Sequence, residues 1–205
     1  MFEFFGAKVE YEEAKILADL TLVLQDLTFT VDILKRLIKL LKDDSKDNIL
    51  IQSYWTASLI SYVRCFSAGK RLGLSEDIFK NTKLEDDPLE CHHYFKNLRD
   101  KHIAHSVNPF EQIVVDLQLS NPKSKKREVL GVSILSQKLI CTTVEGAETF
   151  LRLASIAREE VRKQAKEYEN KTLEVGKKLP INVLYSKGRS RIITPGPEDT
   201  GKARK

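Results

Sequence analysis

All four histidines of the chain lie in one short window of the sequence, at positions 92, 93, 102 and 105. The same window contains an arginine, Arg99. A cluster of imidazoles beside a guanidinium can bind a metal ion, bind phosphate or transfer protons, because the ordinary pKa of an imidazole lies close to neutral pH. The window from residue 91 to residue 105 is therefore the first place to look for chemistry.

A metal site is the weaker of the two interpretations. Cys91, His92 and His93 are consecutive, and neighbours on a helix point about 100° apart, so they cannot all face one ion. His102 and His105 are one helical turn apart and could share an ion. No carboxylate or thiol at a repeated ligand spacing completes the set, and no H-E-x-x-H pattern occurs. The sequence therefore calls for no metal and no cofactor.

Phosphate chemistry fits the residue types better. Arg99 offers a planar, permanently charged donor fork to a phosphodiester. His105 can take a proton from a ribose 2′-hydroxyl or give one to a leaving 5′-oxygen. On an ideal helix the two residues lie about 9 Å apart along the axis and about 120° apart around it, so their side chains must lean into a common groove. Asp100 can accept a hydrogen bond that orients either group.

Residues 99–105 read R-D-K-H-I-A-H. This segment resembles the R-x(4–6)-H motif of the HEPN superfamily (higher eukaryote and prokaryote nucleotide-binding domains). The resemblance implies a helical bundle that forms a homodimer, with two copies of the motif lining one cleft. It also implies a metal-independent endoribonuclease of an abortive-infection, antiviral or toxin–antitoxin system, with RNA as substrate and an antitoxin or another defence protein as partner.

The resemblance also assigns roles to individual residues. Arg99 would bind the phosphate and His105 would transfer the proton. Asp100 would be the third catalytic residue, although the family often has Asn at this place. His102 and Arg64 are secondary candidates for binding the substrate, Arg64 because it lies on an apolar helix that could face the same cleft.

Each of these residues also has a purely structural interpretation. Arg99 could pair with a carboxylate on a neighbouring helix, and His105 could be a C-terminal helix residue favoured by the helix dipole. His102 could be a buried structural histidine and Arg64 a buried structural arginine. His92 and His93 fit packing or solvated positions better than chemical ones.

The remaining sequence predicts the elements that must position this window. Apolar residues at 3-4 spacing indicate a long helix over residues 9–42. A second, largely apolar helix is expected over 48–72, with Asp47 or Asn48 as its N-cap and Gly73 as its C-cap. A third helix is expected over 88–106, ending before Pro109, and a fourth over 144–178.

A change of period separates the third helix from the fourth. Apolar residues alternate with polar ones near residue 115, and a polar, turn-rich connector follows. This pattern predicts a β-hairpin at about 112–140. The fold class is therefore mainly α, a bundle of about four long helices with an inserted hairpin. We expect one helical domain over 1–179 and a basic, disordered tail over 180–205.

Composition narrows the function classes. The net charge is +5, but residues from 177 onward carry +6, so the remainder is close to neutral. No apolar run reaches the roughly 20 residues of a membrane span, which argues against membrane attachment. Three scattered cysteines do not form a disulfide framework, so we expect a reducing, cytoplasmic location.

The sequence favours a HEPN-type endoribonuclease that acts as a homodimer. The alternative is a non-catalytic HEPN-like module that binds nucleotide, RNA or a protein partner. In that case Arg99 and His105 would stabilise a helix interface. A third class is a helical dimer built on the apolar stripe of the first helix, with no ligand at all.

Overall fold

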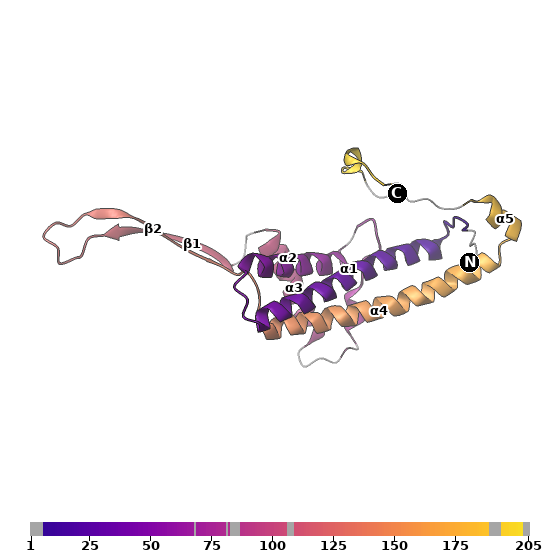
Figure 1. Ribbon diagram of the computed structural model, residues 1–205, viewed down its shortest axis with the longest axis horizontal. Coiled ribbons are helices and arrows are strands. Elements are labelled where there is room, and N and C mark those ends of the chain that lie inside the picture. Colours follow the sequence, from indigo (N-terminus) through magenta and orange to yellow (C-terminus); the bar gives the residue numbers. More distant parts are fainter. Residues whose placement is uncertain are drawn as a thin grey trace.

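The computed structural model describes residues 6–67, 69–80, 82, 87–105, 109–188 and 194–202. Long helices form a bundle, and a two-stranded β-ribbon projects from one end of it (Figure 1). The predicted fold class, mainly helical with an inserted hairpin, is confirmed. The helices are α1 (Glu12–Lys42), α2 (Asn48–Arg64), α3 (Pro88–Leu98), α4 (Val144–Lys177) and the short α5 (Ile181–Ser186). The strands are β1 (Glu111–Leu119) and β2 (Val129–Lys138), and short 3₁₀ turns occupy Glu76–Phe79 and Pro197–Asp199.

The starts of the helices follow from local capping. The Asp47 carboxylate accepts the backbone N–H of Leu50 at 2.9 Å and begins α2, so Asp47 is the N-cap of the two predicted candidates. The Thr143 hydroxyl accepts the N–H of Gly146 at 3.2 Å and begins α4. These side chains satisfy backbone donors that the first helical turn leaves without a partner.

The second helix is shorter than the sequence predicts. It ends at Arg64 and does not continue to residue 72. The chain folds back on its own end, because the N–H of Leu74 donates to the carbonyl of Cys65 at 2.8 Å and the Arg71 guanidinium donates to the carbonyl of Arg64 at 2.9 Å. These bonds use the last carbonyl groups of α2, so the predicted cap at Gly73 is wrong.

The core lies where α1 packs against α4 and α2. The apolar stripe of α1 is fully buried in its middle, at Leu27, Val31 and Leu34. Aromatic rings complete the core beside it. The rings of Phe95 and Phe150 stack with centroids 4.1 Å apart, and the Trp55 ring meets the Phe150 ring edge-on at 5.8 Å. In the described part of the chain, no helix is long and apolar enough to cross a membrane.

The predicted hairpin is present with nearly the predicted bounds. β1 and β2 pair antiparallel from the pair Glu111–Lys138 at the base to the pair Leu119–Val129 at the tip. The register shifts between Gln118 and Leu119, which marks a β-bulge near the tip. The predicted tail is not irregular throughout, since α5 forms directly after Pro180.

Two leucines of α4 test whether the bundle core carries the stability of the fold. Leu153 is fully buried, whereas Leu173 is 55% exposed on the same helix. We expect Leu153→Ala to lower the free energy of unfolding by about 3 kcal/mol, because it removes buried methyl groups and leaves a cavity. Leu173→Ala, the matched control, should cost less than about 1 kcal/mol. Urea denaturation followed by circular dichroism measures both, and equal losses would contradict this assignment of the core.

Candidate active site on a π-helical turn

The predicted motif lies where α3 ends, and it is not part of a regular α-helix. The segment Arg99–Ile103 is a π-helical turn, in which the N–H of Ala104 donates to the carbonyl of Arg99 at 2.9 Å. The α-helix predicted to reach residue 106 therefore ends at Leu98, and residue 106 lies outside the described residues. Single π-helical turns are rare and occur frequently at functional sites.

Arg99 and Asp100 form an ion pair on this turn. The Arg99 Nη1 lies 2.8 Å from the Asp100 Oδ1, and the two side chains are 35% and 41% exposed. Among the described residues, the partner of Arg99 is thus its own chain neighbour and not a carboxylate on another helix. A carboxylate in this position holds the guanidinium in one direction, while solvent still reaches the remaining N–H donors.

His105 lies two residues beyond the π-helical turn and is exposed. Within the described part of the chain it has no hydrogen bond or ion pair. The structure therefore brings Arg99, Asp100 and His105 to one exposed end of α3. It gives none of them a buried structural role.

His102 has a different environment. Its ring is buried, and its Nε2 donates to the carbonyl of Leu139 at 2.8 Å. This bond ties the π-helical turn to the residue that follows β2, at the base of the ribbon. The Nδ1 of the same ring is buried without a hydrogen-bond partner among the described residues. A hollow of about 150 Å³ adjoins the ring, lined also by Gln52, Thr56 and Ile140. The predicted contact of His102 with substrate stays a prediction, and the structure gives the residue an anchoring role.

Arg64 lies away from the motif. Its guanidinium pairs with the carboxylate of Asp26 on α1, and Arg71 pairs with the same carboxylate at 2.7 Å. Asp26 is almost fully buried, so the two arginines neutralise a charge inside the protein. Along α2, Arg64 is eight residues beyond Thr56, about 12 Å in an α-helix. Its predicted role in binding substrate stays a prediction, and the structure does not bring it to the π-helical turn.

The other two histidines belong to a network that the sequence analysis missed. The Tyr62 hydroxyl lies 2.9 Å from the Nδ1 of the buried His92. The Glu76 carboxylate receives His93 Nε2 at 3.0 Å and Lys96 Nζ at 3.1 Å, and the His92 Nε2 lies 3.3 Å away. Burial lowers the pKa of His92 to about 4. Hydrogen bonding, first from His93 and then from Lys96, lowers the pKa of Glu76 to about 2. No sequence spacing links Glu76 to α3, because its partners His93 and Lys96 lie 17 and 20 residues further along the chain.

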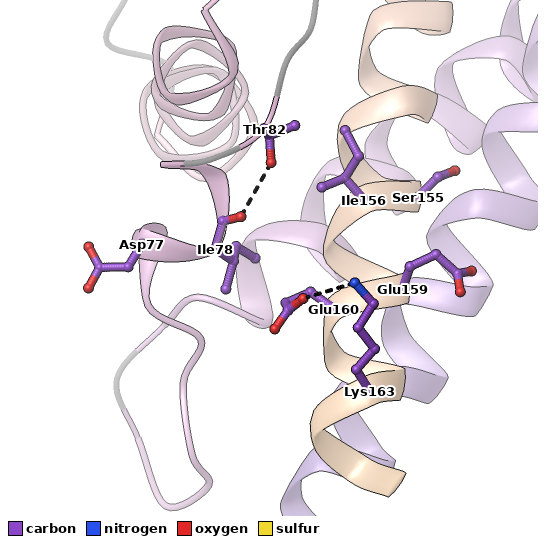
Figure 2. Close-up of a pocket in the computed structure, with 8 residues that line it drawn as sticks. All are labelled: Asp77, Ile78, Thr82, Ser155, Ile156, Glu159, Glu160 and Lys163. Carbon is purple, nitrogen blue, oxygen red and sulfur yellow. Dashed lines mark hydrogen bonds and ion pairs between the residues drawn. The ribbon is translucent and has the colours of Figure 1, made fainter. Parts of the chain in front are cut away.

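A second hollow lies between the Glu76–Phe79 turn and α4 (Figure 2). Its volume is about 570 Å³. The Glu160 carboxylate on its wall pairs with Lys163 at 3.6 Å, and Glu159 pairs with Arg162 at 2.6 Å. None of the sequence-predicted site residues lines it. Its lining consists of Asp77, Ile78, Thr82, Ser155, Ile156, Glu159, Glu160 and Lys163.

Neither a metal site nor a known relative gives further evidence about the function. Among the described residues, no three His, Cys, Asp or Glu side chains gather closely enough to hold a metal ion. Comparisons of the chain with protein families, curated proteins and solved structures found no match. The functional argument therefore depends on residues 99–105 and on what surrounds them.

The buried network predicts a pH dependence of stability. The pKa of His92 is about 4 in the folded chain, below the ordinary value of 6.5, so the unfolded chain binds a proton first as the pH falls. The free energy of unfolding should therefore decrease as the pH falls from 6.5 towards 4, and the low pKa of Glu76 adds a further decrease below pH 4.5.

Thermal melting at several pH values measures this effect. In His92→Gln, which does not titrate, the melting temperature should change less between pH 6.5 and 5 than in the wild type. His93→Gln is the matched control, because its exposed side chain lies on the outside of the same network. Parallel profiles for the wild type and His92→Gln over that range would show that His92 is not the titrating group.

Proposed function

We propose that this chain is a metal-independent endoribonuclease of the HEPN type. The observation that carries the proposal is that Arg99 and Asp100 lie on a partly exposed π-helical turn, with the guanidinium held by the adjacent carboxylate, and that the exposed His105 follows two residues beyond this turn. In cleavage of a phosphodiester without metal, a guanidinium fork can bind the phosphate and an accessible imidazole can carry out one of the two proton transfers.

In the proposed reaction, the 2′-hydroxyl of the RNA attacks the adjacent phosphorus. The O2′–P bond forms, the P–O5′ bond breaks, and the products are a 2′,3′-cyclic phosphate and a free 5′-hydroxyl. His105 takes the proton from the 2′-hydroxyl or gives one to the leaving 5′-oxygen. Arg99 binds the non-bridging oxygens, where negative charge accumulates in the transition state. Asp100 orients the guanidinium.

One imidazole cannot readily serve both oxygens in the same step. In an in-line displacement the attacking and leaving oxygens lie on opposite sides of the phosphorus, so a single ring reaches only one of them. The second proton transfer therefore needs water or another group. A composite site in a homodimer, as the resemblance implies, would meet this need from a second copy.

The runner-up is a module that binds RNA or nucleotide without cleaving it. The contact that favours this alternative is the Arg99–Asp100 pair itself, because the carboxylate offsets much of the positive charge that a phosphate would meet. On either reading, we place the chain by resemblance in antiviral defence or a toxin–antitoxin system. An antitoxin would then act by covering the exposed turn.

RNA cleavage in EDTA tests the proposal. The wild type is expected to cut RNA without added metal, leaving 2′,3′-cyclic phosphate ends. Arg99→Ala and His105→Ala should each lower the rate by on the order of 100-fold or more, because they remove charge stabilisation or proton transfer. His93→Ala, a histidine replaced outside the motif, serves as the matched control and should keep the wild-type rate.

Folding of each variant is verified by circular dichroism and thermal melting. If the folded wild type cuts no member of a broad RNA panel but binds RNA, and Arg99→Ala weakens that binding, the non-catalytic module is correct. Equal cleavage by the wild type and both motif variants would remove residues 99–105 from the reaction altogether.

A further inference from the structure

The β-ribbon has one continuous apolar face. Residues alternate between the two faces of a strand, and the register of β1 with β2 places seven apolar side chains on the same side. All of them are between 58% and 68% exposed. These residues, the apolar ribbon face, are Ile113, Val115, Leu117, Leu119, Val129, Val132 and Ile134.

The opposite face is mostly polar. Gln112, Asp116 and Gln118 of β1 lie there, opposite Gln137, Ser133 and Gly131 of β2, with one apolar pair between them. This pattern is that of a sheet with one face in a core and one in water. The ribbon nevertheless extends away from the bundle, and no described part of the chain covers the apolar ribbon face (Figure 1). A two-stranded hairpin alone is marginally stable in water, so we expect another apolar surface to cover this face.

We propose that the apolar ribbon face packs against the same face of a second copy of this chain. Such packing is self-complementary under a two-fold axis, as in most homodimers. It gives two stacked ribbons about 10 Å apart, with the apolar side chains between them and both polar faces outward. Seven side chains per copy would remove on the order of 1,000 Å² of accessible surface in total, within reach of a specific interface.

The charge of the ribbon tip sets the direction of the stack. The turn between the strands carries Lys123, Lys125, Lys126 and Arg127, and only Lys126 pairs with a carboxylate, that of Glu128, among the described residues. If the two ribbons ran parallel, the two basic tips would lie side by side and repel each other. In the antiparallel stack each tip lies against the far end of the partner's ribbon, so we infer the antiparallel arrangement.

The antiparallel stack brings each tip to the partner's π-helical turn. A nine-residue strand spans about 30 Å, so ribbons overlaid at their centres align the tip of one with the base of the other. The hydrogen bond from His102 to Leu139 fixes the π-helical turn at that base. If the proposed function holds, the tip lysines and Arg127 of one copy bind the phosphates of RNA that lies on Arg99 and His105 of the other. A second copy thus adds its basic tip to each site, and in this arrangement the two π-helical turns lie at opposite ends of the stack and do not share one cleft.

Neighbouring residues on β1 test the interface. Leu117 belongs to the apolar ribbon face and Gln118 to the polar one. We expect the wild type to be a dimer in sedimentation at micromolar concentration, and Leu117→Glu to raise the dissociation constant at least tenfold by burying a charge. Gln118→Glu, the matched control, should remain dimeric. A wild type that stays monomeric at all accessible concentrations overturns the proposal, because another molecule must then cover the face.

A distance between the two tips tests the direction without requiring cleavage. A spin label is attached at Ser124→Cys, with Cys91 and Cys141 replaced by serine. The antiparallel stack separates the two labels by at least about 30 Å, one strand length, whereas a parallel stack brings them within about 20 Å. The short distance would overturn the antiparallel arrangement even if the chain proves not to be a nuclease.

Mixing two inactive variants tests whether the tip acts on the partner's site. His105→Ala lacks the proton-transfer group, and the triple variant K123E/K125E/R127E lacks the basic tip. Each alone should cleave RNA slowly. After subunit exchange, an equal mixture should recover roughly a quarter of the wild-type rate, because half of the dimers then contain one complete site. No recovery in a mixture shown to contain mixed dimers would mean that each tip does not serve the partner's site.

Discussion

The packing of Phe95 on Phe150 is the contact on which the position of the motif depends. It joins α3, a helix of only three turns, to the long α4, and the Trp55 ring on α2 meets both rings edge-on. Because the buried rings fix the direction of α3, they also fix where it ends. The π-helical turn begins four residues after Phe95. The orientation of Arg99 is therefore determined by a contact in the core and not by a loop.

The hydrogen bond of His102 adds a second constraint at the other side of the turn. A buried ring that donates to the Leu139 carbonyl holds the turn against the chain that leaves β2. The wide i→i+5 turn lets His102 point inward while Arg99 stays partly exposed and His105 exposed. An ordinary helical continuation would rotate these side chains differently relative to the core. The two constraints together give a fixed base with a partly accessible surface, which the proposed chemistry at a phosphate would need.

The sequence predicted the elements well and the connections poorly. The 3-4 spacing of apolar residues located α1 and α4 within a few residues of their observed bounds, and the period-2 pattern located the hairpin. Both succeed because burial imposes the period directly. The predicted length of α2 was wrong, because the helix ends where its carbonyl groups accept hydrogen bonds from Leu74 and Arg71. These residues lie seven or more positions further along the chain.

The candidate site was also predictable only in part. The motif string selected Arg99, Asp100 and His105, which lie at the end of α3, but it could not distinguish an exposed histidine from a buried one. His102 and His105 are one turn apart in sequence, yet they differ in burial because only one meets the ribbon base. The partner of Arg64 could not be predicted either. Asp26 lies on α1, 38 residues away, and no local sequence pattern indicates that pair.

The distribution of charge explains why recognition of a polyanion would depend on segments outside the bundle. Along α4, cations are matched by carboxylates one turn away, as in the pairs Glu159–Arg162, Lys171–Glu167 and Lys177–Glu174. Such exposed pairs add little stability, but they leave α4 without net charge. The excess positive charge lies on the ribbon tip and on the chain after residue 176. If the proposed function and the proposed stack both hold, the π-helical turn, whose arginine is already paired with Asp100, gains its attraction for RNA from the cations of the partner's ribbon tip.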